Sequence, residues 1–184
     1  MRVASDTTPL STLAQMGWLD WLRQRWGEVI APEAVWAELG KMKDPVATAA
    51  LDNARHDGWL RILPASNVRL TNSLLEEIDP GEAETIALAL EIGAEFVMID
   101  DRVARESAKR HGLRLAGTMS MVIWAKRQGI IPSARDAALL VRQRTRFFLS
   151  DDFIEEIAHE AGEPGLLDEI KKLMPGPNRE GADG

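Results

Sequence analysis

The chain has 184 residues, of which 45% are hydrophobic and 28% charged, as in an ordinary soluble globular protein, and its net charge is −7. It contains no cysteine, which excludes disulfides and thiolate metal sites. Its apolar runs are too short for a membrane helix, and its start lacks the apolar stretch of a signal peptide, so we expect a cytoplasmic protein with no membrane partner.

Short apolar segments alternate with segments of helical spacing along most of the chain. The expected strands are residues 2–5, 29–31, 59–63, 95–99 and 113–116. The expected helices are residues 8–15, 18–26, 32–39, 45–57, 80–92, 102–111, 118–128, 133–145, 150–161 and 166–174. The clearest helix start is Asp79-Pro80-Gly81-Glu82, with Asp79 at the N-cap position and Glu82 three residues later.

This alternation predicts an α/β fold in which helices cover both faces of a parallel sheet. We expect a core at residues 1–131, a helical extension of the same domain at residues 132–174, and a disordered tail rich in proline and glycine at residues 175–184. In a parallel sheet, the carboxyl ends of the strands gather at one edge, which is where ligands bind.

Acidic residues stand where the expected strands end or the expected helices begin. They are Asp6, Glu38, Glu82, Glu84, Asp100 and Asp101. Carboxylates that lie close together raise one another's pKa unless a cation neutralises them. The three histidines are far apart in the sequence, so a metal here would be held by oxygen, which favours Mg²⁺ or Mn²⁺ over Zn²⁺. One or two such ions can activate a water and neutralise the charge on a phosphate.

Each of these acids also has a purely structural explanation. Asp6, and one of the adjacent pair after the fourth strand, would cap the helix that follows. Glu82 would complete a capping box with Asp79, and Glu38 and Glu84 would be solvent-facing helix residues. One residue suffices for a cap, so the second aspartate of the pair favours a bound cation.

Glu82 and Glu84 lie about 200° apart on an ideal helix. Both can approach one site only because they are in the first turn of their helix. We therefore expect one of them to be a direct metal ligand and the other to act through a water or a neighbouring ligand.

The basic residues are unevenly distributed. Residues 102–146 contain eleven lysines and arginines against two acidic residues, which is typical of a polyanion-binding surface, although a solvated basic face is the alternative. Helical spacing places Arg102, Arg105 and Lys109 on one face, next to the expected acidic edge, as candidate nucleic-acid contacts. The residues expected to face the core from the same helix are Val103, Ala104, Ser107 and Ala108.

Four of the six tryptophans fall between Trp18 and Trp36. Their helical spacing predicts packing in the core or at a subunit interface, and a base-stacking surface is the alternative. No GxxxxGK[ST] or GxGxxG motif supports a nucleotide-driven activity. Phosphoacceptor receivers and dehalogenase-type phosphatases are excluded because their paired acids follow the first strand.

Several stretches of the sequence resemble the PIN-domain superfamily of metal-dependent nucleases, and in particular a small prokaryotic group of PIN-like proteins described as DUF3368. The matching stretches are VASDTTPLSTLAQMG, APEAVWAELGK, DPGEAETIALALEIGAEFVMIDDRVARESAKRHGLRLAGT and MSMVIWAKRQGII, with FFLSDDFIEEIAHEAGE extending the similarity toward residue 163. The resemblance implies a three-layer α/β/α, Rossmann-like fold with a parallel sheet of about five strands, extra C-terminal helices and a shared acidic pocket.

The resemblance also implies roles for individual residues. Asp6 matches the acid that ends the first strand, Glu38 the helical glutamate, and Glu82 and Glu84 a GExE element. Asp100 and Asp101 match the acids after the fourth strand, and Thr8 and Thr118 match positions where small polar side chains orient those carboxylates. The metal ligands implied in this way are Asp6, Glu82, Asp100 and Asp101. This chain departs from the pattern in carrying Thr8 where many relatives have asparagine, and glutamates where the better-studied toxins have an aspartate.

The implied activity is that of a Mg²⁺- or Mn²⁺-dependent endoribonuclease that hydrolyses RNA. Many PIN proteins are the toxins of VapBC-type toxin–antitoxin pairs and form homodimers, so the implied partners are an RNA substrate, an antitoxin protein and a second copy of the chain. The alternative is a non-catalytic PIN-like module that binds nucleic acid or protein.

Overall fold

The computed structural model describes residues 2–165, which form one five-stranded sheet with ten helices around it. The strand order is β3-β2-β1-β4-β5, and every neighbouring pair is parallel. The strands are β1 (Val3–Ser5), β2 (Val29–Pro32), β3 (Leu60–Leu63), β4 (Phe96–Met98) and β5 (Leu115–Ala116). All five expected strands are therefore confirmed, within one or two residues at their ends.

Nine of the expected helices are also present. The helices are α1 (Thr7–Gln15), α2 (Asp20–Trp26), α3 (Glu33–Leu39), α4 (Pro45–His56), α5 (Val68–Leu74), α6 (Pro80–Glu91), α7 (Arg102–Arg110), α8 (Thr118–Arg127), α9 (Ala134–Arg144) and α10 (Asp151–Glu160). The sequence did not predict α5, because Leu74 is its one buried residue and Leu70 packs only partly against the core. The helix expected at 166–174 and the tail at 175–184 lie outside the described residues.

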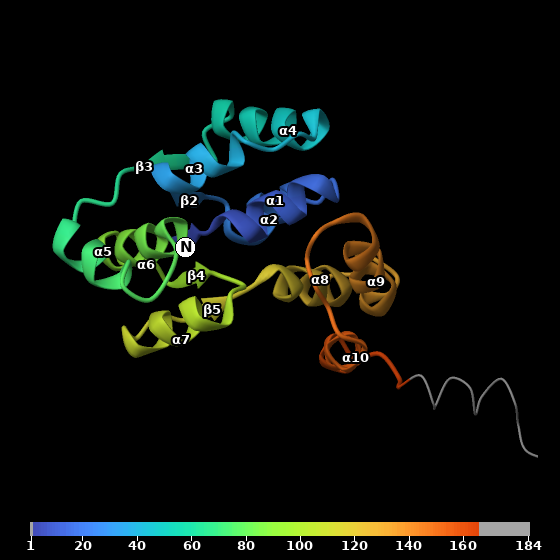
Figure 1. Ribbon diagram of the computed structural model, residues 1–184. Helices are drawn as coiled ribbons and strands as arrows, with labels where there is room; N and C mark the ends of the chain where they lie inside the picture. The colour runs from blue at the N-terminus through green and yellow to red at the C-terminus, as the bar shows by residue number, and fades with distance from the viewer. Residues whose placement is uncertain (1, 166–184) are drawn as a thin grey trace, which may run out of the picture.

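Alternate residues of the central strands pack on opposite faces of the sheet, so the core has two parts. Val3 and Met98 contribute to a cluster with α1, α2, α4 and α8, whereas Ala4 and Val97 contribute to a cluster with α5, α6 and α7. This three-layer α/β/α arrangement confirms the expected fold. Figure 1 shows α8, α9 and α10 grouped at the end of the molecule away from α5.

The tryptophans between residues 18 and 36 pack in the core. Trp21 and Trp26 are each 6% exposed, and Trp18 stacks on Trp21 with ring centroids 4.6 Å apart. Trp36 is partly buried against the same cluster, where the Arg55 guanidinium lies 5.0 Å from its ring centroid. The packing interpretation is confirmed, and these rings do not form a base-stacking surface. None of the described helices is long and apolar enough to cross a membrane.

The register of β1 and β4 determines where the acids lie. Ser5 pairs with Met98, and the backbone N–H of Asp6 donates to the Met98 carbonyl at 3.0 Å. Both strands therefore end at the same level of the sheet, and Asp6 and Asp100 leave them side by side. The register of this parallel pair is sufficient to place the two acids at one edge of the sheet.

Glu163 joins the two C-terminal helices α9 and α10 to each other. Its partly buried carboxylate accepts hydrogen bonds from Ser133 Oγ at 3.2 Å, from the Arg135 N–H at 3.3 Å and from the Ala134 N–H. It thereby caps the start of α9 from a position beyond the end of α10, and Arg135 pairs with Glu155 of α10 at 2.8 Å.

Replacement of Glu163 by alanine is expected to lower the free energy of unfolding by about 2–4 kcal/mol, because the first turn of α9 and the buried Arg135 guanidinium lose a shared acceptor. Urea denaturation measures the change. Glu160→Ala removes an exposed glutamate from the same segment and should change stability by less than about 0.5 kcal/mol. Equal effects of the two substitutions would contradict the capping role.

Candidate functional site

Asp6 lies at the centre of the acidic edge. It follows β1 directly, is 5% exposed and stands at the N-cap position of α1 without a side-chain hydrogen bond of capping geometry. Burial raises the pKa of Asp6 to about 6, and the negative charges of Glu38 and Asp100 add to the effect. The N–H groups of Thr7 and Thr8 oppose it only in part. The negative charge of this carboxylate is therefore only partly compensated by its neighbours.

The two adjacent aspartates after β4 have different partners. Asp100 accepts from the Thr118 N–H at 2.9 Å and from Thr118 Oγ1 at 2.5 Å, which fixes both of its carboxylate oxygens. Burial raises the pKa of Asp100, while these hydrogen bonds and the charge of Arg105 lower it. Asp101 accepts from the N–H groups of Val103 at 2.7 Å and Ala104 at 3.0 Å and is the N-cap of α7. One aspartate of the pair is thus a cap, and the other points into the acidic site.

Two glycines allow the surrounding segments to approach these acids. A Cβ on Gly81 would lie 3.2 Å from Asp6 Oδ1 and 3.5 Å from Glu38 Oε2, so the start of α6 lies directly against both carboxylates. A Cβ on Gly117 would lie 2.7 Å from Asp100 Oδ1, closer than real side chains approach. The absence of a side chain at both positions keeps the acids close together.

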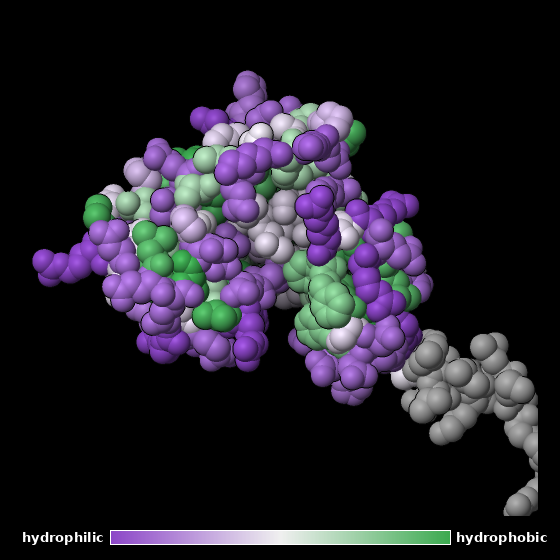
Figure 2. Space-filling model, viewed as in Figure 1, coloured by the Kyte–Doolittle hydropathy of each residue, from purple (hydrophilic) through white to green (hydrophobic). Residues whose placement is uncertain are grey.

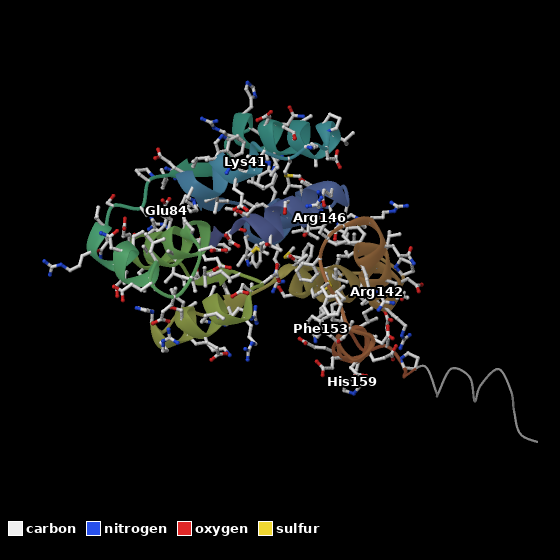
Figure 3. The ribbon with its side chains drawn as sticks, viewed as in Figure 1. Lys41, Glu84, Arg142, Arg146, Phe153 and His159 are labelled. Carbon is white, nitrogen blue, oxygen red and sulfur yellow. The ribbon has the colours of Figure 1, made fainter. Side chains whose placement is uncertain are left out.

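The three glutamates are placed differently. Glu82 accepts from the Asp79 N–H at 3.2 Å, and burial, followed by the charges of Asp6 and Asp101, raises the pKa of Glu82 to about 7. Glu38 is exposed and accepts from Thr7 Oγ1 at 2.6 Å. Glu84 accepts from the Ala34 N–H at 3.1 Å and thereby caps α3. Figure 3 shows Glu84 between α6 and α3.

The structure therefore brings five of the six sequence-predicted acids to one edge and gives Glu84 a capping role. Among residues 2–165, no group of three or more acidic or histidine side chains is spaced to enclose a metal ion. The donor chemistry nevertheless fits Mg²⁺ or Mn²⁺, because Mg²⁺ is held in many proteins by one or two carboxylates and keeps several of its waters. The raised pKa values of Asp6 and Glu82 are consistent with an ion held in this way.

A cleft of about 860 Å³ opens beside these acids. It is lined by α1, by Glu38, Asp100 and Asp101, and by the connection between α9 and α10. Three basic residues complete its walls, namely Lys41, Arg144 and Arg146. Figure 3 shows Lys41, just beyond α3, and Arg146, on the α9–α10 connection, which come from segments more than a hundred residues apart.

The basic residues predicted to form one face of α7 do not line this cleft, and two of the three have partners within the protein. Arg105 donates to the Ile99 carbonyl at 2.8 Å, Lys109 pairs with Glu106 at 2.7 Å, and Arg102 is exposed. The prediction that Val103 faces the core is wrong: it is 45% exposed, because it lies about 100° around the helix from Ala104, whereas Ala104, Ser107 and Ala108 are buried as expected.

Sequence reasoning missed several residues of the site. Thr7, rather than Thr8, holds a carboxylate through its hydroxyl, although Thr8 lines the cleft. Lys41 and Phe148 also line the cleft, and no local pattern pointed to either. Thr118, in contrast, contacts Asp100 as the resemblance implied.

The comparisons with known proteins agree with this architecture. A family model described as PIN domain, DUF3368, matches residues 2–163. No curated protein and no solved structure gives a significant match to the chain.

The raised pKa of Asp6 predicts how stability depends on pH. Because the folded-state pKa of about 6 exceeds the usual value of 3.8, the folded state binds the proton more tightly. In EDTA, Asp6 should therefore cost stability progressively as pH rises from about 4 to 7. Asp6→Asn should be more stable than the parent by about 2–3 kcal/mol at pH 7.5 and about equal to it near pH 4. Thermal and urea unfolding across this range measure the difference.

Asp52→Asn, an exposed aspartate on α4, is the control and should not change the pH dependence. A variant of Asp6 that is less stable than the parent at pH 7.5 would contradict the electrostatic account.

Gly117→Ala is expected to lower the free energy of unfolding by about 1–3 kcal/mol, because the new Cβ displaces the Asp100 carboxylate or the chain beside it. Gly40→Ala is the matched control, since its Cβ would make only ordinary contacts at 3.5 Å, and it should change stability by less than about 0.5 kcal/mol. Urea denaturation distinguishes the two, and equal effects would mean that the edge tolerates a side chain at Gly117.

Proposed function

The chain belongs to the PIN-domain family DUF3368, whose model covers residues 2–163, and we propose on this basis that it is a metal-dependent endoribonuclease that hydrolyses RNA phosphodiester bonds. PIN domains are generally nucleases, which supports the hydrolase class. The observation that carries the proposal is the convergence of Asp6, Glu82 and Asp100, all with raised pKa values, beside a cleft that Asp100 lines and that has basic walls.

The residues that would hold Mg²⁺ or Mn²⁺, as one ion or two, are Asp6, Glu82, Asp100 and Asp101. When bound, such an ion supplies positive charge that activates a water and neutralises a phosphate oxygen. Thr118 holds both oxygens of Asp100, and Thr7 holds Glu38, so these side chains keep their orientation without an ion. Such preorganisation reduces the reorganisation that the reaction requires.

Glu82 has one carboxylate oxygen available to hold an ion, because its Oε2 accepts the Asp79 N–H and its Oε1 takes no part in that bond. Lys41, Arg144 and Arg146, from the walls of the cleft, would bind the phosphates on either side of the cleaved bond.

Several finer features belong to the same proposal. We extend it to a cytoplasmic toxin of a toxin–antitoxin pair, acting as a homodimer with an antitoxin protein as its inhibitor. On α7, Arg102 and Lys109 would extend the basic path beyond the cleft, whereas Arg105 is engaged by strand-end carbonyls.

A non-catalytic binding module is the second candidate. It is favoured by the absence, among the described residues, of a preformed group of three metal-binding side chains, and by the capping bonds that Asp101 and Glu82 already accept. A module of this kind would bind RNA in a salt-sensitive way without turnover.

Cleavage of a mixed structured-RNA pool separates the two candidates. The protein is expected to cut RNA with Mg²⁺ or Mn²⁺ but not with EDTA, and Asp6→Asn and Asp100→Asn should each reduce cleavage by about 100-fold or more. Glu84→Gln keeps an acceptor for the Ala34 N–H and should cut like the parent protein. Metal-dependent cutting that survives both aspartate substitutions would sink the assigned site, and RNA binding without any cutting would favour the second candidate.

A further inference from the structure

A second cavity adjoins the acidic cleft. Its volume is about 520 Å³, and it lies between the β5–α8 junction and α10. Three residues line both cavities, namely Asp100, Phe147 and Phe148. In Figure 2 the surface is notched between the part that carries α7 and the part that carries α10, the two helices whose residues line opposite sides of this cavity. A nucleic-acid strand whose phosphate lies beside Asp100 would therefore have the second cavity next to that phosphate.

Phe148 stands between the two cavities and is 86% exposed. Its neighbour Phe147 is partly buried against the main core, so the connection between α9 and α10 is anchored by one phenylalanine and presents the other to solvent. Core packing therefore does not account for Phe148. An exposed aromatic ring at the mouth of a cleft is suited to stack against a planar partner.

The groups around Phe148 indicate what that partner is. Arg144 and Arg146 precede it on the same connection and line the acidic cleft. Cationic side chains beside an exposed aromatic ring are the arrangement by which proteins follow the phosphates and stack the bases of a single strand. The second cavity also exposes the carboxylates of Glu156 and Glu160, which can accept hydrogen bonds from the N–H edge of a base. A purely apolar partner helix would bury these charges without a counterpart.

We propose that the second cavity receives one unpaired nucleobase, stacked on Phe148, from the strand whose phosphate lies in the acidic cleft. The protein then selects single-stranded over double-stranded RNA, because a base in a duplex is already paired and stacked and cannot enter the cavity. This inference rests on the proposed nuclease function for the position of the phosphate, but its test requires no cleavage.

The test measures binding in the Asp6→Asn background with EDTA, using a fluorescein-labelled 12-nucleotide RNA of alternating C and A, alone and annealed to its complement. Phe148→Ala should weaken binding of the single strand by about 5- to 100-fold, and Phe148→Trp should bind it at least as tightly as the Phe148 protein. Duplex binding should change by less than about twofold in either variant, because it depends on phosphate contacts. Val68→Ala removes an exposed apolar side chain from α5, outside both cavities, and should leave binding unchanged.

A second readout reports stacking directly. With 2-aminopurine in place of one adenine, binding to the Phe148 protein should quench the fluorescence, and binding to Phe148→Ala at saturation should not. Because Phe148 is exposed, the alanine variant should melt at the temperature of the parent.

The base site is overturned if Phe148→Ala binds the single strand as tightly as the Phe148 protein, if it loses single-strand and duplex binding alike, or if the Phe148 protein binds no single strand. The first result would favour a protein partner, rather than a nucleobase, as the group that contacts the exposed Phe148 ring. If binding depends on Phe148 but the protein that retains Asp6 does not cleave RNA in Mg²⁺ or Mn²⁺, the nuclease function is rejected and the base site is supported. If metal-dependent cleavage occurs and is unchanged in Phe148→Ala, the nuclease function is supported and the base site is rejected.

Discussion

The parallel pairing of β1 with β4, with Ser5 opposite Met98, brings the residues that follow the two strands to the same point of the sheet edge. Asp6 and Asp100 therefore leave the sheet side by side, in a place where burial raises the pKa of both. Two buried carboxylates so close together repel each other, and the nearby segments compensate for this repulsion or leave room for the two side chains. Thr118 donates to Asp100, and Gly81 and Gly117 keep side chains out of the space beside the carboxylates. The local structure is organised around two acids that the sheet does not allow to separate.

Helix starts serve the site as well as the fold. Asp101 begins α7, Glu82 closes the first turn of α6, and Glu84 caps α3 from a different helix. A carboxylate that accepts backbone N–H groups keeps a fixed direction, so the bonds that cap the starts of these helices also orient the acidic oxygens. Stability and the geometry of the site are therefore coupled residue by residue. A substitution at Glu82 changes both, whereas Glu84 contributes through the position of α3 alone.

The succession of strands and helices along the chain could be anticipated because alternation of strands and helices, and the capping box at Asp79, are local signals. Placement of the acids at one edge followed from that topology. The rest depended on tertiary structure. The helix α5 buries only Leu74, so its pattern was too weak to detect. Val103 lies about 100° around α7 from Ala104, at the margin of the buried face, which the sequence alone did not resolve. Lys41 reaches the cleft from beyond α3 and Arg146 from beyond α9, and no sequence spacing relates the two. The choice of Thr7 over Thr8 depends on a contact with Glu38 that lies 31 positions away.

The two sides of the cleft are completed at different times as the chain is made. All the acids of the floor, with the threonine that holds Asp100, are present once residue 118 has been added. The opposite wall, which carries Arg144, Arg146 and Phe148, lies between α9 and α10, and the cap that Glu163 gives to the start of α9 requires the chain as far as residue 163. Domains begin to fold from their N-terminal parts during synthesis. A ribosome-bound chain would thus expose an acidic edge that repels polyanions, and it would acquire the basic, aromatic wall only after residue 163 has been added.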